Sequence, residues 1–239
     1  GWHSVVWETE ILGDSEYPAV KFTYHSPDME MGFPGNVDAE IIYTWTDDNE
    51  IVMDYKATID KKTVINLTNH AYFNLHGNAD YFITDHILTI RPSAFTPVDS
   101  FMIPTGEIRS VEGTPFDFRK PLTIERRIGD VDEQLIIGKG YDHNYVLDNS
   151  EEVDAIVFEP ISGRVLEVIT DQPGLQLYVG NFLDGSQKGH GGVVYNFRCG
   201  FCLESGHFPD SPNHPEFPST VLNPGETYKT RTVYRFSIL

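Results

Sequence analysis

The sequence predicts an all-β protein, a large antiparallel β-sandwich or barrel. Apolar and polar residues alternate with a period of two along several segments, and turn pairs such as Pro34-Gly35 and Pro224-Gly225 separate these segments. Aromatic residues, which favour sheets, make up 13% of the chain. Alternating segments between frequent turns are typical of antiparallel sheets, whereas a parallel α/β sheet needs long helical connections that are hard to find here.

The elements follow from this alternation. It is clearest over residues 37–46, 51–59 and 228–238, each of which should form a strand with one packed and one solvated face. The shorter strands are expected at residues 5–12, 19–25, 63–69, 86–90, 154–159, 164–170 and 175–178. The best helix candidate is 124–135, which Gly129 interrupts.

Charge and length limit the possible partners. The 239 residues carry 17 Lys+Arg against 36 Asp+Glu, a net charge of −19. Such a balance argues against nucleic acid and against an anionic membrane surface as partner. No apolar run approaches the roughly 18 residues that a membrane-spanning helix needs. Without a composition break or a repeat, we expect residues 1–239 to form one domain.

Two polar segments could carry chemistry. Residues 66–77 combine amides, aromatic rings and His70, which is either a core histidine in a satisfied network or a group offered to a ligand. Glu204 ends an apolar run, just before a loop at 207–218 that contains four prolines. Partial burial there would raise its pKa and make it a better base near neutrality, although an ordinary glutamate at a strand end is the commoner case.

Three further patterns are weak by themselves. Residues 140–145 and 172–182 place side chains that hydrogen-bond hydroxyl groups beside aromatic rings and tight turns. Cys199 and Cys202 form a C-x-x-C, but the segment has the pattern of a strand, on which two such side chains point to opposite faces. A structural zinc would also need a second pair of ligands, so we expect neither a redox motif nor a zinc site from this motif.

Together these segments resemble the aldose 1-epimerase family. Their order and spacing fit over essentially the whole chain. The matching stretches are Thr68-Asn69-His70-Ala71-Tyr72-Phe73-Asn74-Leu75, Tyr141-Asp142-His143-Asn144, Gln172-Pro173-Gly174 through Gln176 to Gly180-Asn181-Phe182, Leu203-Glu204 with His207-Phe208-Pro209-Asp210-Ser211-Pro212-Asn213-His214-Pro215, Phe217-Pro218, and Leu222-Asn223-Pro224-Gly225-Glu226.

The resemblance implies a β-sandwich fold and a chemistry. These enzymes interconvert the α and β anomers of free aldoses such as galactose and glucose, without a cofactor or metal. The position of the family's general base is Glu204, and that of its general acid is His70. A carboxylate nearby would favour the cationic form of the histidine. The substrate-binding positions that the resemblance implies are Asp142, Gln176, Asn69 and Tyr72.

The sequence departs from the family pattern in three places. Relatives carry an N-terminal portion with an Asn-x-Arg and a Leu-His-Gly-Gly segment before the position of Gly1, so we expect an incomplete sandwich, with another chain as one source of the absent strands. Ser205-Gly206 replace the usual Thr-Gln, which would change the surroundings of the base. His76 stands where a small residue is common, and we expect it to be only a loop residue.

Two alternatives stay open. One is a carbohydrate-binding domain without turnover, against which the intact pair of Glu204 and His70 argues. The other is a hexose-6-phosphate epimerase, for which Arg109, Arg126 and Arg127 are the available cations, although the net charge of −19 disfavours an anionic substrate. The compartment is not determined, and we favour the cytoplasm over a secreted or periplasmic location.

Overall fold

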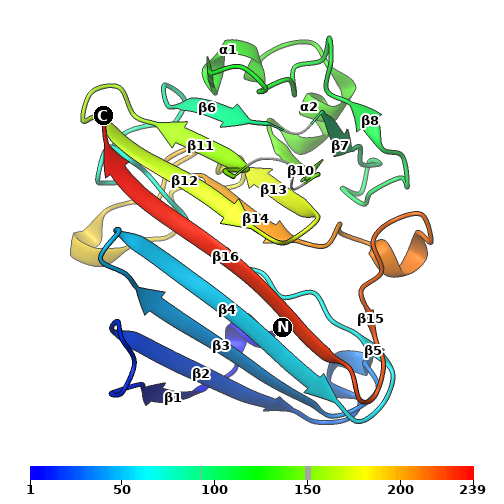
Figure 1. Ribbon diagram of the computed structural model, residues 1–239. Coiled ribbons are helices and arrows are strands. Elements are labelled where there is room, and N and C mark those ends of the chain that lie inside the picture. Colours follow the sequence, from blue (N-terminus) through cyan, green and yellow to red (C-terminus); the bar gives the residue numbers. More distant parts are fainter. Residues whose placement is uncertain (92, 149–151) are drawn as a thin grey trace.

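The computed structural model describes residues 1–91, 93–148 and 152–239. This part of the chain forms three antiparallel sheets with short helices between them (Figure 1). The largest sheet has nine described strands in the order β1-β2-β3-β4-β16-β12-β11-β6-β9. In that order they are Glu8–Ile11, Ala19–Ser26, Val37–Trp45, Glu50–Ile59, Thr227–Ile238, Arg164–Thr170, Ala155–Phe158, Ile87–Ile90 and Leu122–Thr123.

The second sheet has five described strands in the order β14-β13-β10-β7-β8. They are Cys202–Gly206, Gly174–Tyr178, Asp142–Val146, Ala94–Thr96 and Arg109–Ser110. A short pair joins β15 (Val221–Leu222) to β5 (Thr63–Val64). None of the helices in the described residues is long and apolar enough to cross a membrane.

The three strands with the clearest sequence alternation are confirmed as β3, β4 and β16. They are neighbours in the large sheet, where Ile41 pairs with Tyr55 and Tyr55 with Thr230. Met53 and Tyr234 of the same face are buried, in agreement with the predicted packed side. Most of the shorter strands are also confirmed, within a few residues of their predicted ends.

The predicted helix at 124–135 is two helices, α1 (Glu125–Ile128) and α2 (Glu133–Gly138). Gly129 follows α1 as its C-cap. The carboxylate of Asp132 then caps α2 by accepting hydrogen bonds from the amides of the second and third helical residues. The interruption expected at Gly129 is therefore confirmed, and α2 extends beyond the predicted end.

The predicted strand at 63–69 is wrong beyond its first two residues. Only Thr63 and Val64 pair in a sheet, and a loop follows. In that loop the side-chain amide of Asn66 takes the place of a strand partner, because it donates to the carbonyl of His207 and accepts from its amide, at 3.0 and 2.9 Å. Asparagine side chains compete in this way with backbone ladders.

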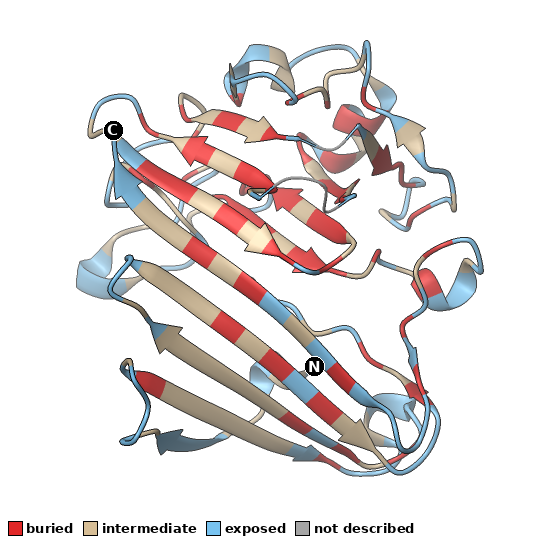
Figure 2. Cartoon of the chain, in the orientation of Figure 1, coloured by how far each residue is buried: buried red, intermediate tan, exposed pale blue. Residues whose placement is uncertain are grey.

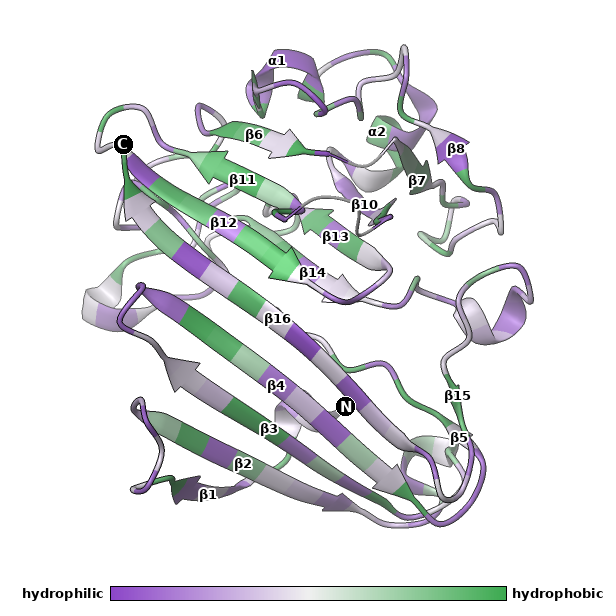
Figure 3. Ribbon diagram, viewed as in Figure 1, coloured by the Kyte–Doolittle hydropathy of each residue, from purple (hydrophilic) through white to green (hydrophobic). Residues whose placement is uncertain are grey.

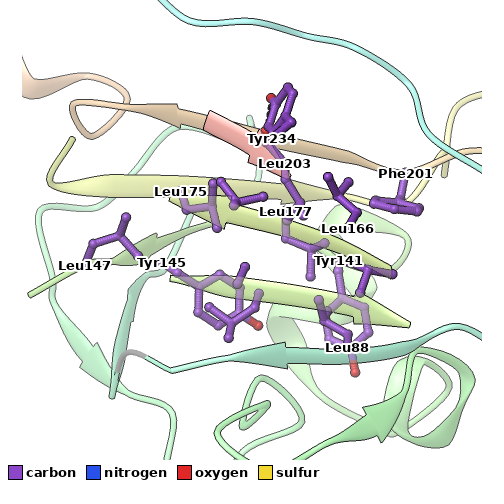
Figure 4. Packing of buried hydrophobic residues seen from close by; sticks show 14 of the residues in the cluster. Leu88, Tyr141, Tyr145, Leu147, Leu166, Leu175, Leu177, Phe201, Leu203 and Tyr234 are labelled. Atoms are coloured by element: carbon purple, nitrogen blue, oxygen red, sulfur yellow. Dashed lines mark hydrogen bonds between the residues drawn. The ribbon is translucent and has the colours of Figure 1, made fainter. Parts of the chain in front are cut away.

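The core lies between the five-stranded sheet and the β16-β12-β11-β6 part of the large sheet (Figure 4). Leu166 of β12 and Leu88 of β6 contribute to it from one layer, and Leu177 of β13 and Tyr145 of β10 from the other; all four are fully buried. Among the described strands, the large sheet ends at β1 and β9 without closing on itself. The fold is therefore a sandwich, as the resemblance implied, and the barrel alternative is wrong.

The β1–β4 part of the large sheet differs from the rest. Figure 2 shows intermediate burial along β2 and β3, whereas β11 to β14 are largely buried. In Figure 3, β11 is hydrophobic along its whole length, whereas β12 is interrupted by hydrophilic positions. The face of β2–β4 that continues the core borders an open groove of about 1760 Å³, which Phe22, Tyr43 and Trp45 help to line. The groove extends to His70 and Tyr72.

Candidate active site

Three adjacent strands bring the predicted carboxylates and amide onto one face of the five-stranded sheet. Gln176 of β13 lies directly opposite Glu204 of β14, and Asp142 of β10 lies on the same face, two positions from the residue that pairs with Gln176. The amide nitrogen of Gln176 donates to Asp142 Oδ1 at 2.7 Å. Because side chains alternate along a strand, Leu175 and Leu177 point the other way, into the core.

His70 reaches this face from the loop that follows β5. Its Nε2 lies 3.5 Å from Glu204 Oε1. The side chain of His70 is 52% exposed, whereas that of Glu204 is only 13% exposed. His70 is therefore not a core histidine. The structure brings the predicted base, in the middle of β14, within 3.5 Å of the predicted acid, which lines the groove.

Burial gives the site unusual electrostatics. It raises the pKa of Glu204 from its ordinary 4.5 to about 8, and the neighbouring charge of Asp142 adds to this. Burial also raises the pKa of Asp142, while the hydrogen bond from Gln176 and the positive charge of His70 act in the opposite direction. Burial thus disfavours the ionised forms of Glu204 and Asp142, and both carboxyl groups lie near the exposed imidazole of His70.

Aromatic rings form a wall beside the pair. Tyr72 stacks on His70 at 5.2 Å between ring centroids, and Tyr178 meets both rings edge-on at 6.1 Å. Phe182 continues the wall, stacked on Tyr178 at 6.2 Å. Our sequence prediction included Tyr72 but missed Tyr178. Its signal was available, because Tyr178 lies two positions from Gln176 on one strand and therefore on the same face.

Asn69 is tied to the opposite side of the groove. Its Nδ2 donates to the hydroxyl of Tyr43 on β3 at 2.8 Å, and its Oδ1 accepts from the amide of Ala71 at 2.9 Å. The position next to His70 is thereby held between two parts of the fold. A substrate-binding role of Asn69 stays a prediction, since these two contacts already occupy part of its hydrogen-bonding capacity.

Both cysteines are free and buried, and they occupy different environments. Cys199 precedes β14, so the expectation that the whole C-x-x-C lies on a strand is wrong. Cys202 is the first residue of β14 and shares the face of Glu204. Its thiol lies in one cluster with the ligand atoms of His70 and Glu204, all within 4.8 Å of one another. This proximity was not predicted from the sequence.

Ser205 and Gly206, the two residues that depart from the family pattern, lie on opposite faces of β14. Ser205 is buried and hydrogen-bonds Thr232 on the far side of β14 from Glu204. Gly206 alternates back to the face of Glu204, where an added Cβ would lie 3.1 Å from Asn66 Oδ1. Of the two, Gly206 is thus the one that changes the surroundings of the base.

His76 is more than a loop residue. Its Nε2 contacts Asp85 Oδ1 at 3.0 Å and its Nδ1 lies 3.6 Å from Glu159 Oε1. His86 Nδ1 contacts the same carboxylate oxygen of Asp85 at 3.0 Å. This cluster joins the end of the 65–86 segment to the turn after β11, and its side chains do not contribute to the Glu204 face.

Comparison with known proteins agrees with this geometry. The family model described as aldose 1-epimerase matches residues 1–235. Human galactose mutarotase is 44% identical over 240 residues, which are 100% of this chain and 67% of that protein. The aldose 1-epimerase of Escherichia coli K12 is 42% identical over 222 residues, covering 91% and 63% of the two chains. The chain thus spans about two thirds of the length of these relatives.

Solved structures give the same result. An aldose epimerase homologue from C. elegans superposes with a TM-score of 0.86 at 31% identity, over 98% of this chain and 69% of that one. Galactose 1-epimerase from Lactobacillus acidophilus also has a TM-score of 0.86, at 28% identity over 98% and 67% of the chains. The proteins matched here are named aldose epimerases and galactose mutarotases, a class of β-sandwich enzymes. The chain is a member of the aldose 1-epimerase family.

Proposed function

We propose that this protein interconverts the α and β anomers of free aldoses, with Glu204 as general base and His70 as general acid. The observation that carries the proposal is the 3.5 Å approach of His70 Nε2 to Glu204 Oε1, beside the hydrogen-bonded pair of Asp142 and Gln176. Family membership and relatives named galactose mutarotase and aldose 1-epimerase support the activity.

The reaction begins with ring opening. The ionised carboxylate of Glu204 removes the proton from the C1 hydroxyl while the imidazolium of His70 protonates the ring oxygen, and the C1–O5 bond breaks. An open-chain aldehyde results. Glu204 is then a carboxylic acid and His70 a neutral imidazole, so each holds the protonation state that the reverse step needs.

Ring closure gives the second anomer. Rotation about C1–C2 turns the other face of the aldehyde toward O5. Neutral His70 takes back the O5 hydroxyl proton as that oxygen attacks C1, and Glu204 returns its proton to the former aldehyde oxygen. The cycle consumes no proton and needs no further reactant. The raised pKa of Glu204, about 8, suits this task because its conjugate acid and base are both accessible near neutrality.

The other residues of the face suit substrate binding. Asp142 and Gln176 offer hydrogen-bond acceptors and donors for sugar hydroxyls, and their mutual hydrogen bond orients both before a sugar arrives. The ring of Tyr72, half exposed, offers an apolar face for the C–H side of a pyranose. Asn69 lies beside them, with its remaining hydrogen-bonding capacity.

A phosphorylated hexose fits less well. Arg109 is occupied by a bidentate pair with Glu107, at 2.8 and 2.7 Å. Arg127 donates to the backbone carbonyls of Thr114 and Asp117. The face around Glu204 instead contributes Asp142, whose negative charge would repel a phosphate. A neutral sugar is therefore the substrate class that we propose.

We also propose that another chain or segment covers the groove in the working protein. The groove exposes the apolar lining of β1–β4, and Trp45 and Ile11 are 47% and 83% exposed at its margin. Exposed apolar surface of this extent marks an interaction site. Intact mass together with size-exclusion chromatography tests this; a stable monomer in solution would argue against a covering chain.

The activity is tested with freshly dissolved α-galactose, followed by polarimetry. We expect the wild-type chain to accelerate mutarotation over buffer, and the substitutions Glu204→Gln and His70→Asn each to lower kcat by ~10²–10⁴-fold. His190→Asn, at an exposed histidine outside the site, serves as control and should retain the rate. Sugar binding without any acceleration would favour the carbohydrate-binding alternative. Wild-type rates in both site variants would overturn the two assignments.

A further inference from the structure

The cluster of His70, Cys202 and Glu204 combines three types of metal ligand. Their ligand atoms all lie within 4.8 Å of one another. A tetrahedral zinc ion with bonds of about 2.0–2.3 Å needs ligand atoms roughly 3.3–3.7 Å apart. The distance between His70 Nε2 and Glu204 Oε1, 3.5 Å, already meets this requirement. A shift of about an ångström by the thiol completes the three-ligand set.

We propose that His70, Cys202 and Glu204 bind a thiophilic divalent cation, zinc or cadmium, and that the ion inhibits the enzyme. The inhibitory part rests on the proposed function, because the ion would occupy the two atoms that transfer protons there. On binding, the Cys202 thiol and the Glu204 carboxyl release their protons to water and become thiolate and carboxylate ligands. The fourth position of the ion stays open to water.

The environment of the cluster favours a cation. Cys202 is fully buried and lies close to the carboxyl groups of Glu204 and Asp142. The carboxylates of Glu204 and Asp142 attract a divalent ion to this position. The half-exposed ring of His70 forms the open side of the cluster, through which an ion can enter.

The second candidate cluster among the described residues, His76, Asp85 and His86, is already satisfied. His86 Nε2 accepts a hydrogen bond from the amide of Leu75 at 3.0 Å, which leaves Nδ1 to donate to Asp85. His76 Nε2 occupies the same carboxylate. A metal here would have to break existing hydrogen bonds, whereas the long contact between His70 and Glu204 leaves room for an ion.

Cadmium titration tests the binding site without reference to catalysis. We expect the wild-type chain to bind one Cd²⁺ with the ultraviolet absorption of a thiolate–cadmium bond. Cys199→Ser, the matched control at the other buried cysteine, should keep this absorption. Cys202→Ser should lose it and bind at least about tenfold more weakly. Absence of the absorption in the wild type, or its loss in Cys199→Ser, would overturn the site.

A second variant protects the test against misfolding of Cys202→Ser. His70 is half exposed, so His70→Asn should fold, keep the thiolate absorption and bind cadmium more weakly. Unchanged affinity in His70→Asn would contradict the three-ligand site.

Inhibition is then measured with Zn²⁺ in the mutarotation assay. We expect zinc to compete with the sugar in the wild type and in Cys199→Ser, whereas the rate of Cys202→Ser, compared with its own rate without metal, should be little affected by zinc. Zinc inhibition of Cys202→Ser equal to that of the wild type would contradict the proposal. If the chain has no mutarotase activity, the cadmium titration still reports binding, so failure of the site and failure of the proposed function are distinguishable.

Discussion

The two halves of the nine-stranded sheet have different surroundings. Strands β16, β12, β11 and β6 pack against the five-stranded sheet and carry fully buried side chains such as Leu88 and Leu166. The same face continues across β2–β4, but there it borders an open groove and its residues are mostly half-buried. The half with β16, β12, β11 and β6 thus forms part of the core, whereas the β1–β4 half is an apolar surface that contains few fully buried side chains (Figure 2).

The candidate active site lies at the boundary of these halves. Glu204 belongs to β14, the edge strand of the covering sheet, and is therefore buried on one side. His70 comes from a loop that spans to Tyr43 on β3 through Asn69. Burial raises the pKa of Glu204, the proposed base, while the groove leaves His70, the proposed acid, exposed. A buried carboxyl group and an exposed imidazole therefore lie side by side, with 3.5 Å between Glu204 Oε1 and His70 Nε2.

A matched pair of isoleucines tests the contrast in stability. Ile90 of β6 is fully buried and Ile11 of β1 is 83% exposed. We expect Ile90→Ala to reduce the free energy of unfolding by about 2–5 kcal/mol, because it leaves a cavity in the core. Ile11→Ala should change it by less than about 0.5 kcal/mol. Urea denaturation measures both, and equal losses would show that the β1 half is as well packed as the β6 half.

The burial of Glu204, the proposed base, should cost stability. Its pKa is about 8 in the folded protein against an ordinary 4.5, so the native state retains a proton that the unfolded state loses between these values. Stability should therefore fall as pH rises from about 4.5 to about 8. Glu204→Gln removes this loss, which has an upper bound of about 5 kcal/mol at about 1.4 kcal/mol per pKa unit.

Denaturation at pH 5 and pH 8 measures this effect. The variant should gain stability over the wild type from the lower to the higher pH, while its activity is lost. A constant difference between the two proteins at both pH values would contradict a raised pKa of Glu204.

The charge of Asp142 should shift the pH profile. The proposed mechanism needs Glu204 ionised and His70 protonated, so kcat/KM should rise with pH as Glu204 ionises and fall again where His70 loses its proton. Asp142→Asn removes the negative charge that helps to raise the pKa of Glu204, and the rise should move to lower pH. The variant should also bind sugar more weakly. A profile that keeps its position, or moves to higher pH, would mean that Asp142 does not act on the base.

Removing the hydrogen bond between Asn69 and Tyr43, which joins the active-site loop to β3, has the smallest expected effect. Tyr43→Phe deletes the hydroxyl that accepts from Asn69 and should reduce stability by about 0.5–1.5 kcal/mol. With the neighbouring His70 less firmly placed, kcat should fall several-fold while KM changes little. Phe22 packs edge-on against the same ring, so Phe22→Leu serves as a control that alters packing but retains the hydroxyl. A similar fall of kcat in both variants would indicate a general loss of packing.

The sequence predicted much of the fold, because period-two alternation reports directly which face of a strand is buried. It succeeded for β3, β4 and β16 and failed for residues 65–69, where the side chain of Asn66 replaces a backbone partner. No periodicity can reveal such a substitution. The split of the helix at Gly129 was predictable, since glycine is a poor helix former.

The site was predictable residue by residue but not as an arrangement. Motif resemblance indicated Glu204, His70, Asp142 and Gln176, and the structure brings these four together. The position of Cys202 beside them depends on strand register and on the path of a loop, neither of which the sequence displays. From the sequence, Cys202 was considered only together with Cys199, as the second cysteine of a C-x-x-C.

The central claim, that Glu204 transfers the proton that interconverts anomers, is tested most directly by NMR exchange spectroscopy on galactose at anomeric equilibrium. With the wild-type chain we predict exchange cross-peaks between the α and β anomeric protons. Glu167→Gln, at a glutamate of β12 that pairs with Arg235, is the matched control and should retain them. Folded Glu204→Gln should show exchange no faster than buffer. Cross-peaks of wild-type intensity with Glu204→Gln would contradict the account.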